Sequence, residues 1–198
     1  GSEMCIRDSI YYYIDKFNKE EIYKLNKSIN IIYRNYSNKF NTKELLQLVI
    51  FCKKQRRKVY ISNNFKLALR FNFDGVYIPS FNKSLRYKKI KKKNFDVIGS
   101  AHNIKEVINK ELQGCTKIFL CPIFRTKKNR SHLGVTKFNL IKLSTKKDII
   151  ALGGINEKNI KYLRMCNVKG FAGITWVKKN GPSINLSLIH ISEPTRQF

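Results

Sequence analysis

The chain has 198 residues, of which 40 are lysine or arginine and 13 are aspartate or glutamate, so its net charge is +27. This length fits one domain with a substantial core, and no apolar run is long enough to span a membrane. The five cysteines show neither a paired C-x-x-C motif nor a histidine at metal-ligand spacing. A disulfide scaffold and a structural zinc site are therefore excluded, and we expect a cytoplasmic protein.

The two ends of the chain share a DNA origin. The sequences GSEMCIRD at the start and LSLIHISEP from residue 186 are translations of one short DNA read on opposite strands. That DNA resembles the transposase adapter of sequencing libraries, so we interpret residues 1–9 and 186–198 as adapter-derived artefacts and set them aside. Without them 38 basic and 10 acidic residues remain, a net charge of +28.

A positive charge of this size is typical of proteins that bind nucleic acid or anionic membranes. Here the lysines accompany abundant Asn, Ile, Tyr and Phe, which share A/T-rich codons, and only Lys53–Lys58 and Lys88–Lys93 form local clusters. Genome composition accounts for such a spread. We expect small phosphorylated substrates as partners, with no nucleic acid and no membrane, and the sequence leaves the oligomeric state open.

Eight short runs rich in Ile, Val, Phe and Tyr predict β-strands. They are Ile10–Ile14, Ser28–Arg34, Lys58–Ser62, Gly75–Pro79, Asp96–Gly99, Lys117–Cys121, Asp148–Leu152 and Gly170–Thr175. The stretches between them are helical in pattern: Lys16–Asn26, Thr42–Lys54, Asn64–Phe71, Leu85–Lys92, Ile104–Leu112, Asn139–Ser144 and Glu157–Cys166. Strict alternation predicts an α/β fold with a parallel sheet, and eight strands in so few residues favour a (β/α)₈ TIM barrel over residues 10–185.

The eighth predicted strand is followed by only a short stretch before residue 186. We expect Trp176–Asn185 to leave no room for the last helix. The barrel would then be open at one flank or capped by residues 186–198, and Ile10–Tyr13 would lack part of its cover.

Two segments carry the features of an anion site. The sixth run ends at Pro122 and leads into a basic loop, where Thr126, Lys127 and Lys128 would face an anionic ligand, unless the lysines merely solvate the loop. Gly153 and Gly154 follow the seventh run, and Gly173 lies in the matching position of the eighth. Glycines let backbone N–H groups approach an anion, so these turns predict a phosphate cup, with a structural turn as the alternative.

Six short motifs stand in one order along the chain: IIYR at 31–34, ISNN at 61–64 with LA at 67–68, DGVYIP at 74–79, IGSAH at 98–102, PIFRT at 122–126 and ALGGI at 151–155. In order and spacing they resemble the thiamine phosphate synthase and thiazole tautomerase superfamily of small (β/α)₈ barrels. The resemblance covers nearly all of residues 10–177. It implies a transferase that joins hydroxymethylpyrimidine diphosphate to thiazole phosphate and releases pyrophosphate.

In that reaction the diphosphate leaves first and the thiazole nitrogen captures the pyrimidine cation, so the site needs cations and good alignment more than acid or base. The resemblance implies that the diphosphate contacts are Arg34, Asn63 and Ser100, assisted by Lys127 or Lys128. It also implies that Thr126 contacts the thiazole and that its phosphate is held by Gly153, Gly154, Ile174 and Thr175. His102 is a further candidate because it follows Ser100, although a lone loop histidine is usually ordinary surface.

The chain departs from the family pattern at several positions. Tyr36 replaces a second basic residue. Where synthases have two metal-binding aspartates, this chain has Asn64 and, in the loop after Pro79, either Asn82 or no evident match. Mg²⁺ is implied by the resemblance, but neutral amides bind it poorly, so we assign no metal ligand. Pro122 occupies the position of the tautomerase histidine, which argues against that activity.

Simpler roles are open for the candidate residues. Ser100 could end a strand, Asn63 could cap a helix, and Arg34 could pair with a carboxylate at the rim. The second functional hypothesis is accordingly a non-catalytic or regulatory relative that binds a phosphate ligand and has lost the diphosphate site.

Overall fold

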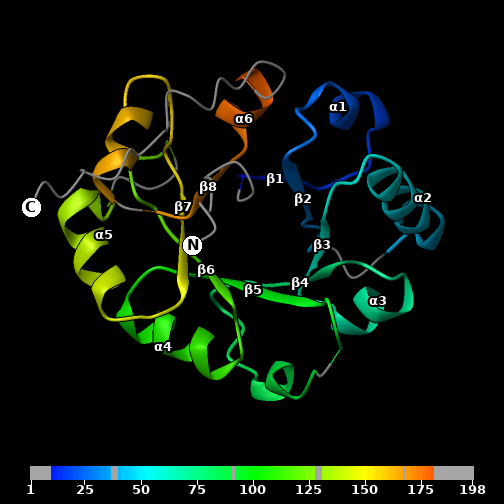
Figure 1. The fold of residues 1–198 in the computed structure, drawn as a ribbon, viewed down its shortest axis with the longest axis horizontal. Coiled ribbons are helices and arrows are strands. Elements are labelled where there is room, and N and C mark those ends of the chain that lie inside the picture. The colour runs from blue at the N-terminus through cyan, green and yellow to red at the C-terminus, as the bar shows by residue number, and fades with distance from the viewer. Residues whose placement is uncertain (1–9, 37–39, 91, 128–130, 167, 181–198) are drawn as a thin grey trace, which may run out of the picture.

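The computed structural model describes residues 10–36, 40–90, 92–127, 131–166 and 168–180 (Figure 1). Eight parallel strands form a closed barrel in sequence order. The strands are β1 (Ile10–Ile14), β2 (Ile29–Tyr33), β3 (Val59–Ser62), β4 (Gly75–Ile78), β5 (Asp96–Ala101), β6 (Lys117–Leu120), β7 (Asp148–Leu152) and β8 (Gly170–Gly173). The predicted (β/α)₈ architecture is confirmed.

Helices follow the strands and surround the barrel (Figure 1). They are α1 (Lys19–Lys24), α2 (Thr42–Lys54), α3 (Phe65–Arg70), α4 (Ile104–Leu112), α5 (Gly134–Leu143) and α6 (Thr175–Asn180), with 3₁₀ helices η2 (Leu85–Lys89) and η3 (Ile160–Cys166). Asparagine side chains accept backbone N–H groups at the starts of four of them: Asn18, Asn41, Asn64 and Asn103. These caps satisfy N–H groups that have no partner within the helix. No helix in the described ranges has the length and apolar character needed to cross a membrane.

The expectation of an open barrel is wrong, and the alternative of a cap by residues 186–198 lies outside the described residues. β8 pairs with β1, with Phe171 opposite Ile10 and Gly173 opposite Tyr12. The strand pairing itself closes the ring, so closure does not need a long last helix. Helix α6 (Thr175–Asn180) covers the first part of the stretch where we expected no helix, and Trp176 packs against Phe171 with ring centroids 5.4 Å apart. All of β1 is buried, so its cover is complete.

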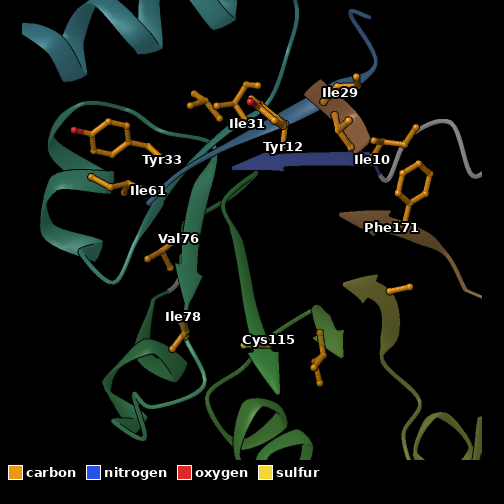
Figure 2. Packing of buried hydrophobic residues seen from close by; sticks show 14 of the residues in the cluster. Ile10, Tyr12, Ile29, Ile31, Tyr33, Ile61, Val76, Ile78, Cys115 and Phe171 are labelled. Carbon is orange, nitrogen blue, oxygen red and sulfur yellow. The ribbon is translucent and has the colours of Figure 1, made fainter. Parts of the chain in front are cut away.

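The core has two parts because successive strand residues face opposite sides of the sheet. The outer part lies between strands and helices, and Figure 2 shows some of its members, including Ile31, Ile61 and Phe171. The inner part, which we call the lumen cluster, comprises Tyr11, Tyr13, Ile32, Tyr60, Tyr77, Ile98, Phe119, Ile150 and Ala172. Its aromatic rings pack edge to face around Phe119, at 4.8 Å from Tyr11 and 5.6 Å from Tyr77. The lumen is therefore filled, and a ligand has to bind above it.

Candidate functional site

The carboxyl ends of the eight parallel strands meet at one end of the barrel, which we call the mouth. The structure brings five predicted residues there, each at or just after the end of a different strand: Arg34, Asn63, Ser100, Thr126 and Gly153. Segments far apart in sequence are thus gathered at a single rim, as the anion-site hypothesis requires.

Sequence reasoning missed three polar residues of the mouth. Asp15, Ser62 and Cys121 each lie two positions beyond a lumen residue and so continue the inward-facing row of their strand. Counting in twos from the lumen positions would have found them. Ser62 is 1% exposed, and within the described chain its hydroxyl and that of Tyr13 have no hydrogen-bond partner. A ligand or water at the mouth can supply one.

Arg34 contributes the principal cation of a pocket beside β1. Its guanidinium carbon lies 4.7 Å from the centre of the Tyr13 ring, a cation–π contact that holds it above the lumen cluster. The pocket has a volume of about 250 Å³ and is lined by Tyr12, Tyr13, Ile14, Asp15, Lys16, Glu21, Arg34, Ile174 and Lys178. None of the carboxylates in the described ranges forms an ion pair with Arg34. The rim ion pair considered from the sequence is therefore absent in that part of the chain.

The glycine turn after β7 packs tightly against the loop after β6. Gly153 and Gly154 have φ values of 95° and 74°, which favour glycine. A Cβ at Gly153 would come within 2.9 Å of Pro122 Cβ, and one at Gly154 within 2.3 Å of the Phe124 carbonyl oxygen. The structural-turn interpretation thus holds for both positions.

The same turn also has the features of an anion cup. The N–H groups of Gly153 and Gly154 have no acceptor in the described part of the chain. Leu152 pairs with Ala172, so Gly153 lies next to Gly173 on the neighbouring strand. Exposed Ile174 then connects this turn with the Arg34 pocket, and exposed Thr175 begins α6.

Asn63 is held by a neighbouring loop. It has a φ of 60°, and its N–H donates to the Tyr77 carbonyl at 2.8 Å. Its Oδ1 accepts from Asn82 Nδ2 at 2.5 Å, and Asn82 Nδ2 also donates to the Tyr87 hydroxyl at 3.0 Å. The helix cap considered for Asn63 is in fact Asn64, whose Oδ1 accepts from the Leu67 N–H at 3.0 Å.

Ser100 and His102 follow one another on β5 and its loop but have different surroundings. Ser100 is 5% exposed and lies beside Tyr77. Burial raises the pKa of Tyr77 to about 12, while the Ser100 hydroxyl acts in the opposite direction. The His102 Nδ1 lies 2.9 Å from Glu106 Oε2, which also accepts the His102 backbone N–H at 2.8 Å. This carboxylate in the first turn of α4 fixes the ring, so a structural role accounts for His102.

The basic loop after β6 is described only in part. Thr126 is half-buried, Lys127 is exposed, and Lys128 lies outside the described residues. The loop is tied to its neighbours through Ile123, whose N–H donates to the Leu152 carbonyl at 2.9 Å. Thr126 therefore belongs to a loop that is anchored beside the glycine turn.

Comparison with known proteins agrees with this geometry. A family model described as thiamine monophosphate synthase matches residues 19–177, which is most of the chain. The chain belongs to the thiamine monophosphate synthase family.

Individual relatives carry the same name. A thiamine-phosphate synthase of Prochlorococcus marinus is 31% identical over 134 residues, which are 66% of this chain and 39% of that protein. The chain spans less than half the length of the Prochlorococcus relatives that it matches. The putative thiamine-phosphate synthase 2 of Aquifex aeolicus is 32% identical over 125 residues, or 62% of this chain and 67% of that protein.

Solved structures agree on the fold. The thiamine phosphate pyrophosphorylase of Pyrococcus furiosus superposes with a TM-score of 0.73 at 18% identity, and the superposition covers 92% of this chain and 96% of that one. The corresponding protein of Bacteroides thetaiotaomicron gives a TM-score of 0.59 at 17% identity, covering 92% and 93%. At these identities the likeness shows the barrel alone.

The residues at the expected metal positions of the family do not fit Mg²⁺. Asn64 Oδ1 is engaged by the Leu67 N–H, and Asn82 Oδ1 accepts the Ser84 N–H at 2.8 Å. Both side-chain oxygens are thus used within the protein, and Mg²⁺ favours carboxylates. Across the described ranges, no group of three or more His, Cys, Asp and Glu residues is arranged to hold a metal ion.

Proposed function

We propose that this chain joins hydroxymethylpyrimidine diphosphate to thiazole phosphate and releases thiamine phosphate and pyrophosphate. The observation that carries the proposal is the continuity of the mouth, where the Arg34 pocket and the glycine turn meet at Ile174. One end of this continuous site offers a guanidinium, and the other offers backbone N–H groups. Two phosphorylated molecules could then lie side by side with their reacting atoms between these ends.

Each bond change is assigned to the substrates. The bond between the pyrimidine methylene carbon and the diphosphate oxygen breaks, and pyrophosphate leaves with the electron pair. The thiazole nitrogen then donates its lone pair to the methylene carbon and forms the new C–N bond. Arg34 would stabilise the charge that develops on the leaving group, with help from Lys127. Neither bond change requires proton transfer by a side chain.

The buried hydroxyls would position the first substrate. Ser100, Ser62 and Tyr13 line the top of the lumen, and the last two have unpaired hydroxyl groups within the described chain. Hydroxyl groups that are buried without a partner are costly, so a ligand that hydrogen-bonds them gains more than it would from exposed groups. We assign Ser62 and Tyr13 to the pyrimidine end of the substrate, below the Arg34 pocket, and Ser100 to the adjoining diphosphate.

A non-catalytic phosphate-binding role is the second candidate. It is favoured by Tyr36, which is 54% exposed and meets Phe81 with ring centroids 5.8 Å apart, where the family pattern implies a basic residue. With that cation absent, the mouth could hold the diphosphate less firmly than a synthase does. The glycine turn would still bind thiazole phosphate.

A turnover assay separates the two candidates. The full chain would be incubated with both substrates, with and without Mg²⁺, and thiamine phosphate would be quantified after conversion to a fluorescent product. Wild-type protein should form product, and Arg34→Met should lower the rate by about 100-fold, because a charged contact to the leaving group is lost. The matched control Arg70→Met removes an exposed arginine from α3 and should leave the rate unchanged. Absence of product from wild-type protein under both conditions would refute the transferase, and binding of thiazole phosphate in that case would support the second candidate.

A further inference from the structure

Helix α4 carries a lysine that is completely buried. Lys110 is 0% exposed, and its ammonium donates to the Pro79 carbonyl at 2.8 Å, the Asn82 carbonyl at 2.9 Å and Gln113 Oε1 at 2.9 Å. No carboxylate in the described ranges pairs with it. An ammonium held only by neutral acceptors is costly to bury, so its presence in the core calls for a specific role.

A glycine on β5 leaves space for the Lys110 side chain. A Cβ at Gly99 of β5 would come within 2.8 Å of Lys110 Cδ and 3.0 Å of Cys115 Sγ. The lysine stem therefore passes over the strand where a side chain is missing. Its ammonium reaches the backbone just beyond the end of β4.

The ammonium anchors the loop that follows β4. The Asn82 carbonyl accepts from Lys110 and also from Gln113 Nε2 at 2.9 Å, and Gln113 Nε2 donates to the Ser84 carbonyl at 2.9 Å. The side chain of the same Asn82 reaches Asn63 Oδ1 at 2.5 Å. Asn82 thus links α4, through its backbone carbonyl, to Asn63, a predicted substrate contact just after β3, through its side chain.

We propose that Lys110 is a positioning residue, an internal cation that fixes the loop after β4 and, through Asn82, orients Asn63 for the diphosphate without a divalent metal ion. The proposal rests on the proposed function only for the identity of the diphosphate substrate. Asn64 and Asn82 stand where the family resemblance implies metal-binding aspartates, and the Lys110 ammonium binds the backbone of the loop that carries Asn82. In this chain the Lys110 ammonium would order the loop after β4 in place of a bound metal ion.

Pyrophosphate and thiazole phosphate serve as separate probes of the two halves of the mouth. Their affinities would be measured by calorimetry on the full chain, in EDTA and in MgCl₂, for wild type and Lys110→Met. The matched control is Lys105→Met, which removes an exposed lysine from the same helix. Wild-type protein should bind pyrophosphate in EDTA within about twofold of its affinity in MgCl₂, and Lys110→Met should weaken pyrophosphate by about tenfold. The control should match wild type.

Thiazole phosphate distinguishes positioning from general loosening of the barrel. Its affinity should stay within about twofold in Lys110→Met, because the glycine turn lies on the other side of the mouth. Asn82→Ala keeps the backbone carbonyl that Lys110 binds and removes the link to Asn63, together with the side-chain contacts to the Tyr87 hydroxyl and the Ser84 N–H. It should reproduce the selective loss even if Lys110→Met fails to fold.

Three results would overturn the proposal: pyrophosphate binding that requires Mg²⁺ or is absent in EDTA, equal weakening of both probes, or unchanged pyrophosphate affinity in Asn82→Ala. Selective weakening of pyrophosphate in a protein that forms no thiamine phosphate would remove the proposed function and leave the role of Lys110 intact.

Discussion

The glycine turn after β7 offers a sharp test of the geometry at the mouth. Replacing Gly154 by alanine introduces two separate costs. Its φ of 74° is unfavourable for an L side chain, and the new Cβ would lie 2.3 Å from the Phe124 carbonyl oxygen and 2.6 Å from that of Arg125. The loop after β6 must move for the side chain to fit, because these contacts are to backbone rather than to the end of a flexible side chain.

Gly134 provides a matched control within the same chain. It has a similar φ of 67°, yet a Cβ there would meet nothing within 4 Å. Gly134→Ala should therefore carry only the backbone cost, about 1 kcal/mol. Gly154→Ala should carry that cost together with the displaced loop, a total of about 3 kcal/mol. The difference between the two variants isolates the steric contact.

Urea unfolding followed by circular dichroism would measure the free energy of unfolding of each variant, and calorimetry would measure its affinity for thiazole phosphate. We expect Gly154→Ala also to weaken thiazole phosphate by about tenfold, because its Cβ displaces the loop beside the cup, while Gly134→Ala leaves that affinity unchanged. Equal destabilisation by the two variants would refute the close approach of Gly154 to the loop after β6. Full affinity in a destabilised Gly154→Ala would refute the cup.

Three further predictions concern buried polar groups. Tyr13→Phe removes a hydroxyl without a partner in the described chain, so unfolding free energy should rise by up to about 1 kcal/mol while affinity for hydroxymethylpyrimidine diphosphate falls; a loss of stability would show that the hydroxyl is satisfied in the folded protein. Burial lowers the pKa of Lys110 to about 8, from about 10.5 in the unfolded chain. Between pH 8 and pH 10.5 the unfolded chain therefore binds more protons than the folded protein, so the free energy of unfolding rises with pH. The stability of wild type relative to Lys110→Met, measured in urea at about pH 7 and about pH 9.5, should increase by roughly 2 kcal/mol, and a decrease would contradict the assignment. Arg57 is 3% exposed, and its guanidinium donates to the Ile29 carbonyl at 2.9 Å. Arg57→Met should therefore lower the free energy of unfolding by about 3 kcal/mol in the same assay. The control Arg56→Met changes an exposed arginine and should stay within about 0.5 kcal/mol of wild type.

Helix α2 was predictable because its signals are local. Asn41 caps its first turn, and an apolar stripe runs down one face, so its predicted and observed limits agree at Thr42–Lys54. Helix α5 was predicted to start at Asn139 but starts at Gly134. The Gly134 N–H donates to the Ile123 carbonyl at 3.0 Å and so fixes the start of the helix. Local sequence does not predict this contact, because Ile123 lies in the loop after β6.

A residue of the mouth was predictable from the sequence where it lies at the carboxyl end of a predicted strand. Arg34 and Gly153 follow predicted strands, and parallel strands place their carboxyl ends at one rim. The partners of those residues could not be predicted, because they come from other elements. Asn63 meets Asn82 from the loop after β4, and the misassigned cap belongs to its neighbour Asn64.

The sequence by itself determined the alternation of strands and helices, and through it the barrel and the rim at which its polar residues gather, because these depend on local periodicity. Tertiary structure decided closure between β1 and β8, the aromatic filling of the lumen and the path of Lys110 over Gly99. Each of these depends on which atoms from distant parts of the chain come within contact distance, and that is set only when the elements pack.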